Sequence, residues 1–156
     1  MCGIFGIVLN NNNENIYNLI INGLIQLQNR GYDSAGVCII KNKKFEVNKC
    51  ASTNKLNALD KLMNMTDIKE AKDNVCIGIG HNRWATHGVK NDTNAHPHLS
   101  GDANFVIIHN GIIENYNEIK QKLIKAGFIF NSQTDTEVIV NLLQYNYTCN
   151  VEETNM

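Results

Sequence analysis

The sequence predicts an α+β fold, in which helices cover sheets of antiparallel strands. Short apolar segments typical of strands mix with segments of helical periodicity, and the strict β-α-β repeat of parallel sheets does not appear. Two strand-like segments also flank a lysine-asparagine turn, which predicts a hairpin. The 156 residues, 43% hydrophobic and 19% charged, suit one domain with a substantial core.

The N-terminal half supplies the hairpin and amphipathic helices beside it. An apolar run over 3–9 predicts a buried strand, and apolar residues at helical spacing predict a helix over 16–28. The segments 37–41 and 44–50 are the strands of the hairpin. Leucine and methionine side chains recur on one face of a helix predicted over 54–65.

The middle of the chain contains a long stretch without regular pattern. A strand is predicted over 75–81, and residues 82–104 follow it without clear periodicity. Loops of that length inside a compact domain are usually functional or disordered. The chain then returns to a strand over 105–111, which ends in an Asn-Gly pair.

The last part of the chain predicts helices separated by a short strand. A helix over 115–127 begins at an asparagine and closes at a glycine, and residues 128–130 predict the strand. A final helix is predicted within 134–147, because Thr134 and Glu137 have the spacing of a capping box ahead of an apolar face.

Composition excludes several classes of function. The net charge of −1 gives no reason to expect a nucleic-acid or membrane-surface partner, and no stretch reaches the roughly 18 apolar residues of a membrane span. The N-terminus lacks the pattern of a secretory signal. The five cysteines are spread out and never form a CxxC pair, which indicates reduced thiols in the cytoplasm.

Cys2 stands directly behind the initiator methionine. If Met1 is removed, one residue carries both a thiol and a free α-amine. The thiolate is the nucleophile, and an α-amine can take up and return a proton near neutral pH. This pair suits acyl transfer through an acyl-enzyme, without a separate histidine base. The alternative is a small buried cysteine that begins a strand.

Acyl transfer to an amino-acid substrate needs further groups, and the chain offers candidates. Asn110 and Gly111 can donate from a side-chain amide and a backbone N–H to an oxyanion, although Asn-Gly is also a common turn. Arg83 can bind a carboxylate and Asp135 an ammonium group. Alternatively, Arg83 lies in a surface ion pair and Asp135 serves a helix terminus.

The histidines allow a zinc site as an alternative interpretation. His87, His96 and His98 lie close together in sequence, with His81 and Cys76 upstream. The spacing is not the i, i+4 spacing of helical ligands, and no CxxC supports it. Roles in loop packing or in hydrogen bonding to a substrate loop fit these histidines better. No phosphate loop or dinucleotide fingerprint is present, so no cofactor is expected.

Six motifs in order along the chain resemble one family. They resemble the glutaminase domain of the class II, N-terminal-nucleophile glutamine amidotransferases from residue 2 to about 147. The second, third and fourth motifs favour the branch that transfers ammonia to fructose 6-phosphate in amino-sugar (hexosamine) biosynthesis. The motifs are CGIFGIV, NRGYDSAG, GHNRWATHG, NAHPH, HNGIIENY and SQTDTEV.

The resemblance implies a four-layer αββα sandwich and glutamine hydrolysis through a γ-glutamyl thioester. Cys2 corresponds to the nucleophile and its α-amine to the base. Asn110 and Gly111 correspond to the oxyanion-hole positions. Arg83 corresponds to the residue that binds the glutamine carboxylate, and Asp135 to the residue that binds its ammonium group.

The resemblance also implies roles for residues that spacing alone does not select. Thr86 and His87 lie in the glutamine-site loop of the family, and Trp84 with Arg30 lies near the gate that closes over glutamine. It implies no metal and no cofactor, and it allows a homodimer.

The family's glutaminase domain continues beyond this length and is followed, in this branch, by sugar-isomerase domains. The resemblance therefore implies that residues 1–156 are a truncated glutaminase domain, incomplete at the C-terminus, with fructose 6-phosphate as a partner only where isomerase domains are present. The alternative function is a catalytically inactive remnant with a binding or regulatory role.

Overall fold

A computed structural model describes residues 2–10, 14–65, 76–85 and 88–154. Within them no helix is both long and apolar enough to cross a membrane. The elements in chain order are β1 (Gly3–Val8), α1 (Ile16–Gln26), η1 (Gln28–Arg30), β2 (Ser34–Lys41), β3 (Lys44–Ala51), α2 (Ala58–Asn64), β4 (Ile77–Arg83), β5 (His98–Leu99), β6 (Val106–Ile107), α3 (Tyr116–Lys125) and α4 (Glu137–Thr154).

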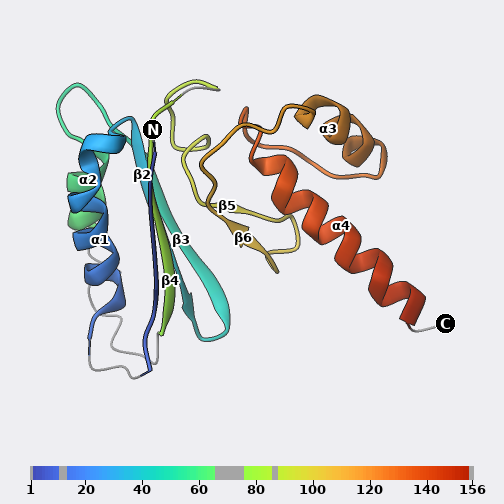
Figure 1. The fold of residues 1–156 in the computed structure, drawn as a ribbon, viewed down its shortest axis with the longest axis horizontal. Helices are drawn as coiled ribbons and strands as arrows, with labels where there is room; N and C mark the ends of the chain where they lie inside the picture. The colour runs from blue at the N-terminus through green and yellow to red at the C-terminus, as the bar shows by residue number, and fades with distance from the viewer. Residues whose placement is uncertain (1, 11–13, 66–75, 86–87, 155–156) are drawn as a thin grey trace.

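The elements form four layers, as the resemblance implies (Figure 1). Helices α1 and α2 cover one face of a four-stranded sheet, β5 and β6 lie on its other side, and α3 and α4 lie outside them. The predicted α+β class with an αββα sandwich is confirmed. The second sheet is small, because β5 and β6 are two residues each and the rest of that layer is loop.

The order of the large sheet, β1-β4-β2-β3, places β4 in its interior. Strand β4 pairs antiparallel with both β1 and β2, and the register sets Gly3 opposite Asn82 and Ser34 opposite Arg83. Because the start of β1 lies beside the end of β4, this register brings Cys2 next to Trp84.

The apolar core lies between the large sheet and its two helices. Ile16, Ile20 and Leu24 of α1 are completely buried, as is Leu62 of α2. Burial of each such side chain contributes about 1.5–3 kcal/mol. The Tyr17 hydroxyl donates to the Leu62 carbonyl at 3.2 Å, and burial holds the pKa of Tyr17 well above its usual value.

The loop before β5 is held against the other face of the large sheet. The Lys49 ammonium on β3 donates to the carbonyls of Thr93, Ala95 and Pro97 at 3.2, 2.7 and 3.1 Å. Burial lowers the pKa of Lys49 to about 8. Only glycine fits at position 36 of β2, because a Cβ there would collide with the His96 carbonyl. The loop can therefore lie directly on the strand.

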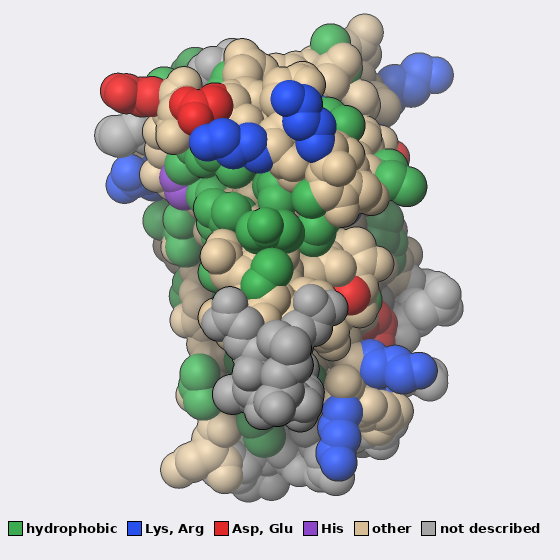
Figure 2. Space-filling view, turned by 90° about the vertical axis from the view of Figure 1, so that its right-hand side faces the viewer, with side chains coloured by type: hydrophobic (Ala, Val, Ile, Leu, Met, Phe, Trp, Pro, Cys, Tyr) green, Lys and Arg blue, Asp and Glu red, His purple; other side chains and the backbone are tan. Residues whose placement is uncertain are grey.

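The outer helices cover this layer and leave apolar side chains in solvent. Figure 2 views the molecule from the side of α3 and α4 and shows apolar side chains gathered between charged ones. Ile124, Leu143 and Tyr147 are each more than two-fifths exposed.

Helix α3 ends in a Schellman motif, in which Gly127 has φ +91° and the Phe128 N–H donates to the Leu123 carbonyl at 3.0 Å.

Three local predictions are wrong in whole or in part. The strand predicted over 105–111 is reduced to β6, Val106–Ile107. Residues 128–130 form no strand, because Phe128 completes the end of α3 and packs its ring against Tyr145. The capping box is also absent. Helix α4 begins at Glu137, whose carboxylate accepts from the backbone N–H groups of Asn131 and Ser132 at 2.8 and 2.7 Å.

Candidate active site

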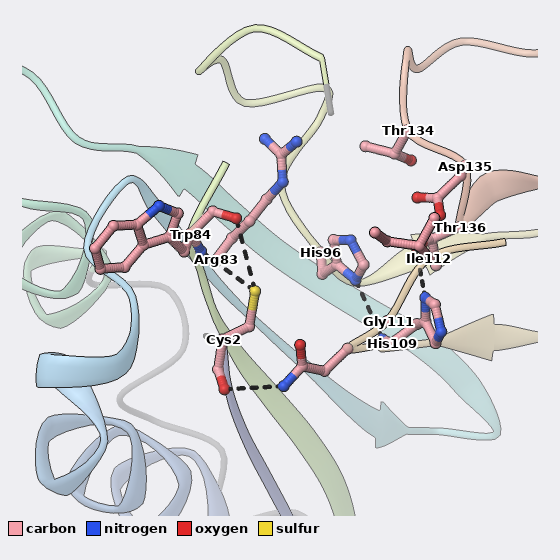
Figure 3. Close-up of a pocket in the computed structure, with 11 residues that line it drawn as sticks. Cys2, Arg83, Trp84, His96, His109, Gly111, Ile112, Thr134, Asp135 and Thr136 are labelled. Carbon is pink, nitrogen blue, oxygen red and sulfur yellow. Dashed lines mark hydrogen bonds between the residues drawn. The ribbon is translucent and has the colours of Figure 1, made fainter. Parts of the chain in front are cut away.

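A cavity of about 290 Å³ lies where the end of the large sheet meets the loops of the second layer (Figure 3). Five separate segments contribute to its walls: the N-terminus, the end of β4, the loop before β5, the segment after β6 and the segment before α4. The lining residues are Cys2, Arg83, Trp84, His96, His109, Asn110, Gly111, Ile112, Thr134, Asp135 and Thr136.

The Cys2 thiol faces this cavity from the large sheet. Its Sγ accepts from the Trp84 backbone N–H at 3.3 Å and lies 3.7 Å from the Trp84 carbonyl. The Asn110 side-chain amide donates to the Cys2 carbonyl at 3.2 Å, across 108 residues of sequence. Cys2 is half-buried, so its sulfur is held in place and still reachable.

Two other cysteines show what a purely structural thiol looks like in this fold. Cys38 and Cys50 are buried in the large sheet, and burial raises their pKa values to about 12 and about 11. Such thiols stay protonated and unreactive. The alternative of a buried structural cysteine fits these two residues and does not fit Cys2.

Opposite charges lie on different walls of the cavity. Arg83 ends β4 and Asp135 precedes α4, and both are buried, with 4% and 6% of their surface exposed. Burial lowers the pKa of Arg83, while Cys2, Asp33 and Asp135 act in the opposite direction and favour its charged form. The Asp135 carboxylate accepts from the Ile113 N–H at 2.7 Å. An arginine and a carboxylate held in this way match the two charges of an α-amino acid.

The segment His109–Gly111 lies between these walls. A Cβ at Gly111 would lie 2.8 Å from Nε2 of the His109 ring, so any larger residue there would displace that ring. The His109 Nδ1 contacts the Thr136 hydroxyl at 3.1 Å, which ties this segment to the start of α4. The Asn110 amide and the Gly111 N–H therefore lie on a segment fixed from both sides of the cavity.

Three buried histidines, His81, His96 and His98, form a cluster beside the cavity, and His96 is one of the residues that line it. The rings of His81 and His96 stack at 4.3 Å, and His98 packs edge-on against His96 at 4.7 Å. Burial lowers the pKa of His81 to about 4 and that of His98 to about 3, and it lowers that of His96 as well.

The zinc interpretation finds no support in this cluster. His98 contacts the Thr134 hydroxyl at 2.9 Å, and His81 and His96 contact the backbone of His109. Among the described residues, no three His, Cys, Asp or Glu side chains are placed to hold a metal ion. His87 lies outside the described residues.

Six of the predicted site residues meet in the cavity: Cys2, Arg83, Trp84, Asn110, Gly111 and Asp135. The Trp84 indole packs edge-on against Tyr32, with ring centroids 5.4 Å apart, and turns away from Thr134 and Asp135 (Figure 3). Arg30 lies in η1, is exposed and is not among the described residues that line the cavity. Thr86 and His87 lie outside the described residues.

Sequence reasoning assigned no site role to several lining residues. His109, Ile112, Thr134 and Thr136 are immediate neighbours of the Asn-Gly pair and of Asp135. Their proximity in sequence to candidate groups is the signal that could have selected them.

Comparison with known proteins supports a single family. Residues 66–153 match the family model described as a glutamine amidotransferase domain. Relatives called glutamine–fructose-6-phosphate aminotransferase (isomerizing) include those of Caldanaerobacter subterraneus, 44% identical over 98% of this chain and 24% of the relative, and Buchnera aphidicola, 48% identical over 93% and 22%. The Acanthamoeba polyphaga mimivirus relative, named as a probable one, is 47% identical over 93% and 23%. The chain thus spans about a quarter of the length of these relatives.

Solved structures give the same result for the fold. A glutamine phosphoribosylpyrophosphate amidotransferase from B. subtilis, complexed with ADP and GMP, superposes with a TM-score of 0.71 at 26% identity, over 92% of this chain and 29% of that one. A structure described as the allosteric regulatory enzyme of purine biosynthesis superposes with a TM-score of 0.72 at 26% identity, with the same coverage.

Proposed function

Because the chain belongs to the glutamine amidotransferase domain family, we propose that it hydrolyses glutamine to glutamate and ammonia through a thioester on Cys2. The observation that supports this most is the single cavity in which the Cys2 thiol, the Asn110–Gly111 pair and the opposite charges of Arg83 and Asp135 meet.

Substrate binding in this proposal uses the two charged walls. Arg83 binds the α-carboxylate of glutamine with paired N–H groups, and Asp135 accepts from its α-ammonium group. The side-chain amide of glutamine then points toward Cys2. Thr86 and His87 belong to the loop around glutamine in this proposal, and Trp84 with Arg30 to the gate above it.

The first chemical step forms the thioester. Removal of Met1 frees the Cys2 α-amine, which takes the thiol proton, and the thiolate attacks the side-chain carbonyl carbon of glutamine. The carbonyl oxygen becomes an oxyanion that accepts from the Asn110 amide and the Gly111 N–H. An amide NH₂ has two hydrogens, so Asn110 can keep its bond to the Cys2 carbonyl and donate the other.

The remaining steps release both products. The Cys2 ammonium returns its proton to the departing nitrogen, the C–N bond breaks and ammonia leaves. The same amine then accepts a proton from water, which attacks the thioester, and the thiolate leaves as glutamate forms. Loss of an oxyanion donor typically costs 10²- to 10³-fold in kcat, so both donors matter to the rate.

The acceptor of the ammonia belongs to a longer protein in this proposal. The relatives are named for fructose 6-phosphate, and this chain matches about a quarter of their length. We assign the present chain the glutaminase half of that reaction, with the transfer to fructose 6-phosphate depending on sugar-isomerase domains. A cytoplasmic location is part of the proposal, because thiols stay reduced there.

Glutamate release by the purified protein tests the proposal. Intact mass spectrometry first establishes whether Met1 has been removed, because a retained methionine leaves the amine in a peptide bond. The processed wild-type protein should release glutamate, and Cys2→Ala should reduce the rate to background. Cys149→Ala, which removes a half-buried thiol from α4, is the matched control and should keep the activity. Glutamine binding by calorimetry without turnover in the processed wild type would favour an inactive remnant.

A further inference from the structure

The backbone of His109 is held at both its polar groups by histidine side chains. Its N–H donates to Nδ1 of His96 at 3.3 Å, and its carbonyl lies 3.1 Å from Nε2 of His81. A carbonyl only accepts, so His81 carries its proton on Nε2. His96 accepts at Nδ1, so that nitrogen carries no proton.

Both rings are placed to keep these roles. They stack on each other at an interplanar angle of 15°, with 0% and 4% of their surface exposed. Nδ1 of His81 is buried with no hydrogen-bond partner among the described residues, so a proton on it would be a buried donor without an acceptor. Burial, together with Arg83 nearby, lowers the pKa of both rings.

We propose that His81 and His96 form a clamp on His109 that positions Asn110 and Gly111 for the oxyanion. The clamp rests on the proposed glutaminase function, and it makes His81 and His96 positioning residues rather than catalytic ones. It joins β4, through His81, and the loop before β5, through His96, to the segment that carries the oxyanion donors.

The position of His109 explains why a clamp is needed. Asn110 and Gly111 are both exposed, and β6 ends at Ile107, so no strand ladder holds them. Outside the clamp, the His109 ring contacts Thr136, and the Asn110 amide donates to the Cys2 carbonyl. Oxyanion donors act only when they are held at the position where the charge develops. Displacement of reacting groups by about 1 Å can cost on the order of 100-fold in rate.

Two substitutions at His96 separate hydrogen bonding from packing. His96→Phe keeps a ring to stack on His81 and removes the acceptor for the His109 N–H. His96→Asn removes the ring and places an amide oxygen close to the position of Nδ1. The clamp predicts that kcat falls about 100-fold in His96→Phe, with little change in KM for glutamine, and falls less than tenfold in His96→Asn. A packing role predicts the reverse order, which would overturn the proposal.

Binding measurements give a readout that does not depend on turnover. The γ-aldehyde analogue of glutamate adds the Cys2 thiolate to its carbonyl carbon, and the resulting oxygen lies where the oxyanion forms. His96→Phe should weaken aldehyde binding by the same factor as kcat and leave glutamate binding unchanged. Equal weakening of both ligands would show that His96 binds the substrate directly, against the clamp.

A spectroscopic measurement tests the geometry without any activity. In ¹⁵N-labelled wild-type protein, the N–H···N bond should give a scalar coupling between the His109 backbone nitrogen and His96 Nδ1. Absence of the coupling in folded protein overturns the clamp. If His96→Phe does not fold, His81→Phe and His81→Gln repeat the comparison, because the glutamine amide can donate from near Nε2. Wild-type protein that shows the coupling and releases no glutamate overturns the proposed function instead.

Discussion

The two faces of the large sheet are covered in different ways. On the side of α1 and α2, the sheet is covered by a contiguous apolar cluster, which includes Ile16, Ile20, Leu24, Val37, Ile39 and Leu62. On the other side lies a polar layer (residues 88–137), whose buried side chains are mostly polar. They include Asn94, His96, His98, Ser132, Thr134, Asp135, Thr136 and Glu137.

The apolar side mainly supplies stability, and the polar layer mainly sets the geometry of the site. Apolar burial is roughly proportional to area and has no direction, so it contributes stability without fixing the orientation of individual polar groups. Hydrogen bonds between buried polar groups are directional and costly to leave unmade. A site that must hold reacting groups within about 0.5 Å needs directional contacts. The cavity lies where the polar layer meets the sheet, and hydrogen bonds of His96, Thr136 and Asp135 hold its walls on the side of the polar layer.

The largest effect of a single substitution on stability is expected on the apolar side. Leu24 is completely buried in α1, so Leu24→Ala should reduce the free energy of unfolding by about 3 kcal/mol. Urea denaturation measures this loss. Since the polar layer is untouched, kcat and KM of the folded variant should equal those of the wild type. A changed KM in fully folded protein would contradict the separation of the two sides.

A pH change should act mainly on the histidines between sheet and polar layer. His81 and His98 have pKa values of about 4 and about 3 in the folded protein, below the ordinary 6.5, because burial opposes their charge. Above pH 6.5 both histidines are neutral in the folded and in the unfolded protein, so their burial costs no stability through protonation. As the pH falls below 6.5, the unfolded chain takes up protons that the folded protein does not. Each histidine then costs about 2 kcal/mol at pH 5.

Urea denaturation at pH 7 and pH 5 tests this expectation. The wild-type midpoint should be clearly lower at pH 5. Leu24→Ala serves as a control, because it should lower the midpoint by a similar amount at both pH values. The groups facing these rings include Lys49, Arg83 and His109, and Lys49 and Arg83 both disfavour a further positive charge. Equal wild-type midpoints at the two pH values would contradict neutral buried histidines.

The smallest of these effects on stability is expected within the polar layer, where a substitution should also weaken glutamine binding. The Asn94 amide donates to the Val89 carbonyl at 2.8 Å, and its oxygen accepts from the Gln133 N–H at 2.8 Å. Asn94→Ala should cost about 1–2 kcal/mol of stability. It should also raise KM for glutamine several-fold, because Gln133 lies two residues before Asp135.

An exposed asparagine provides the matched control for this variant. Asn104 is exposed and donates to Asp102 at 2.8 Å within the same turn, so Asn104→Ala should leave KM unchanged. Steady-state kinetics on both variants, together with urea denaturation, give the two measurements. Similar KM values in the two variants would show that the polar layer does not position the glutamine site.

Most regular elements could be predicted from local sequence. The strand at 3–9, the helix at 16–28 and the hairpin over 37–50 agree with β1, α1 and β2–β3 to within a few residues. Periodicity succeeds there because each element buries one face against the same apolar core. It failed at 128–130, where apolar residues end a helix and pack on α4 without a neighbouring strand.

The candidate site was predictable in part. The chemistry of Cys2, Arg83, Asn110 and Asp135 selected them as candidates, and the structure places all four at one cavity. The clamp on His109 was not predictable, because its contacts join residues 13 and 28 positions apart that lie on three separate segments. Hydrogen bonds of this kind depend on how loops pack in the folded protein, which no local sequence pattern encodes.

By itself, the sequence determined which reactive groups the protein has and which segments bury an apolar face. These properties are local, because they depend on side-chain chemistry and on the spacing of apolar residues. Only the tertiary structure decided that Cys2 faces Asn110 across 108 residues and that the rings of three histidines pack against one another nearby. The physical reason is that strand register and loop packing set distances between remote segments, and these arise only when the layers assemble.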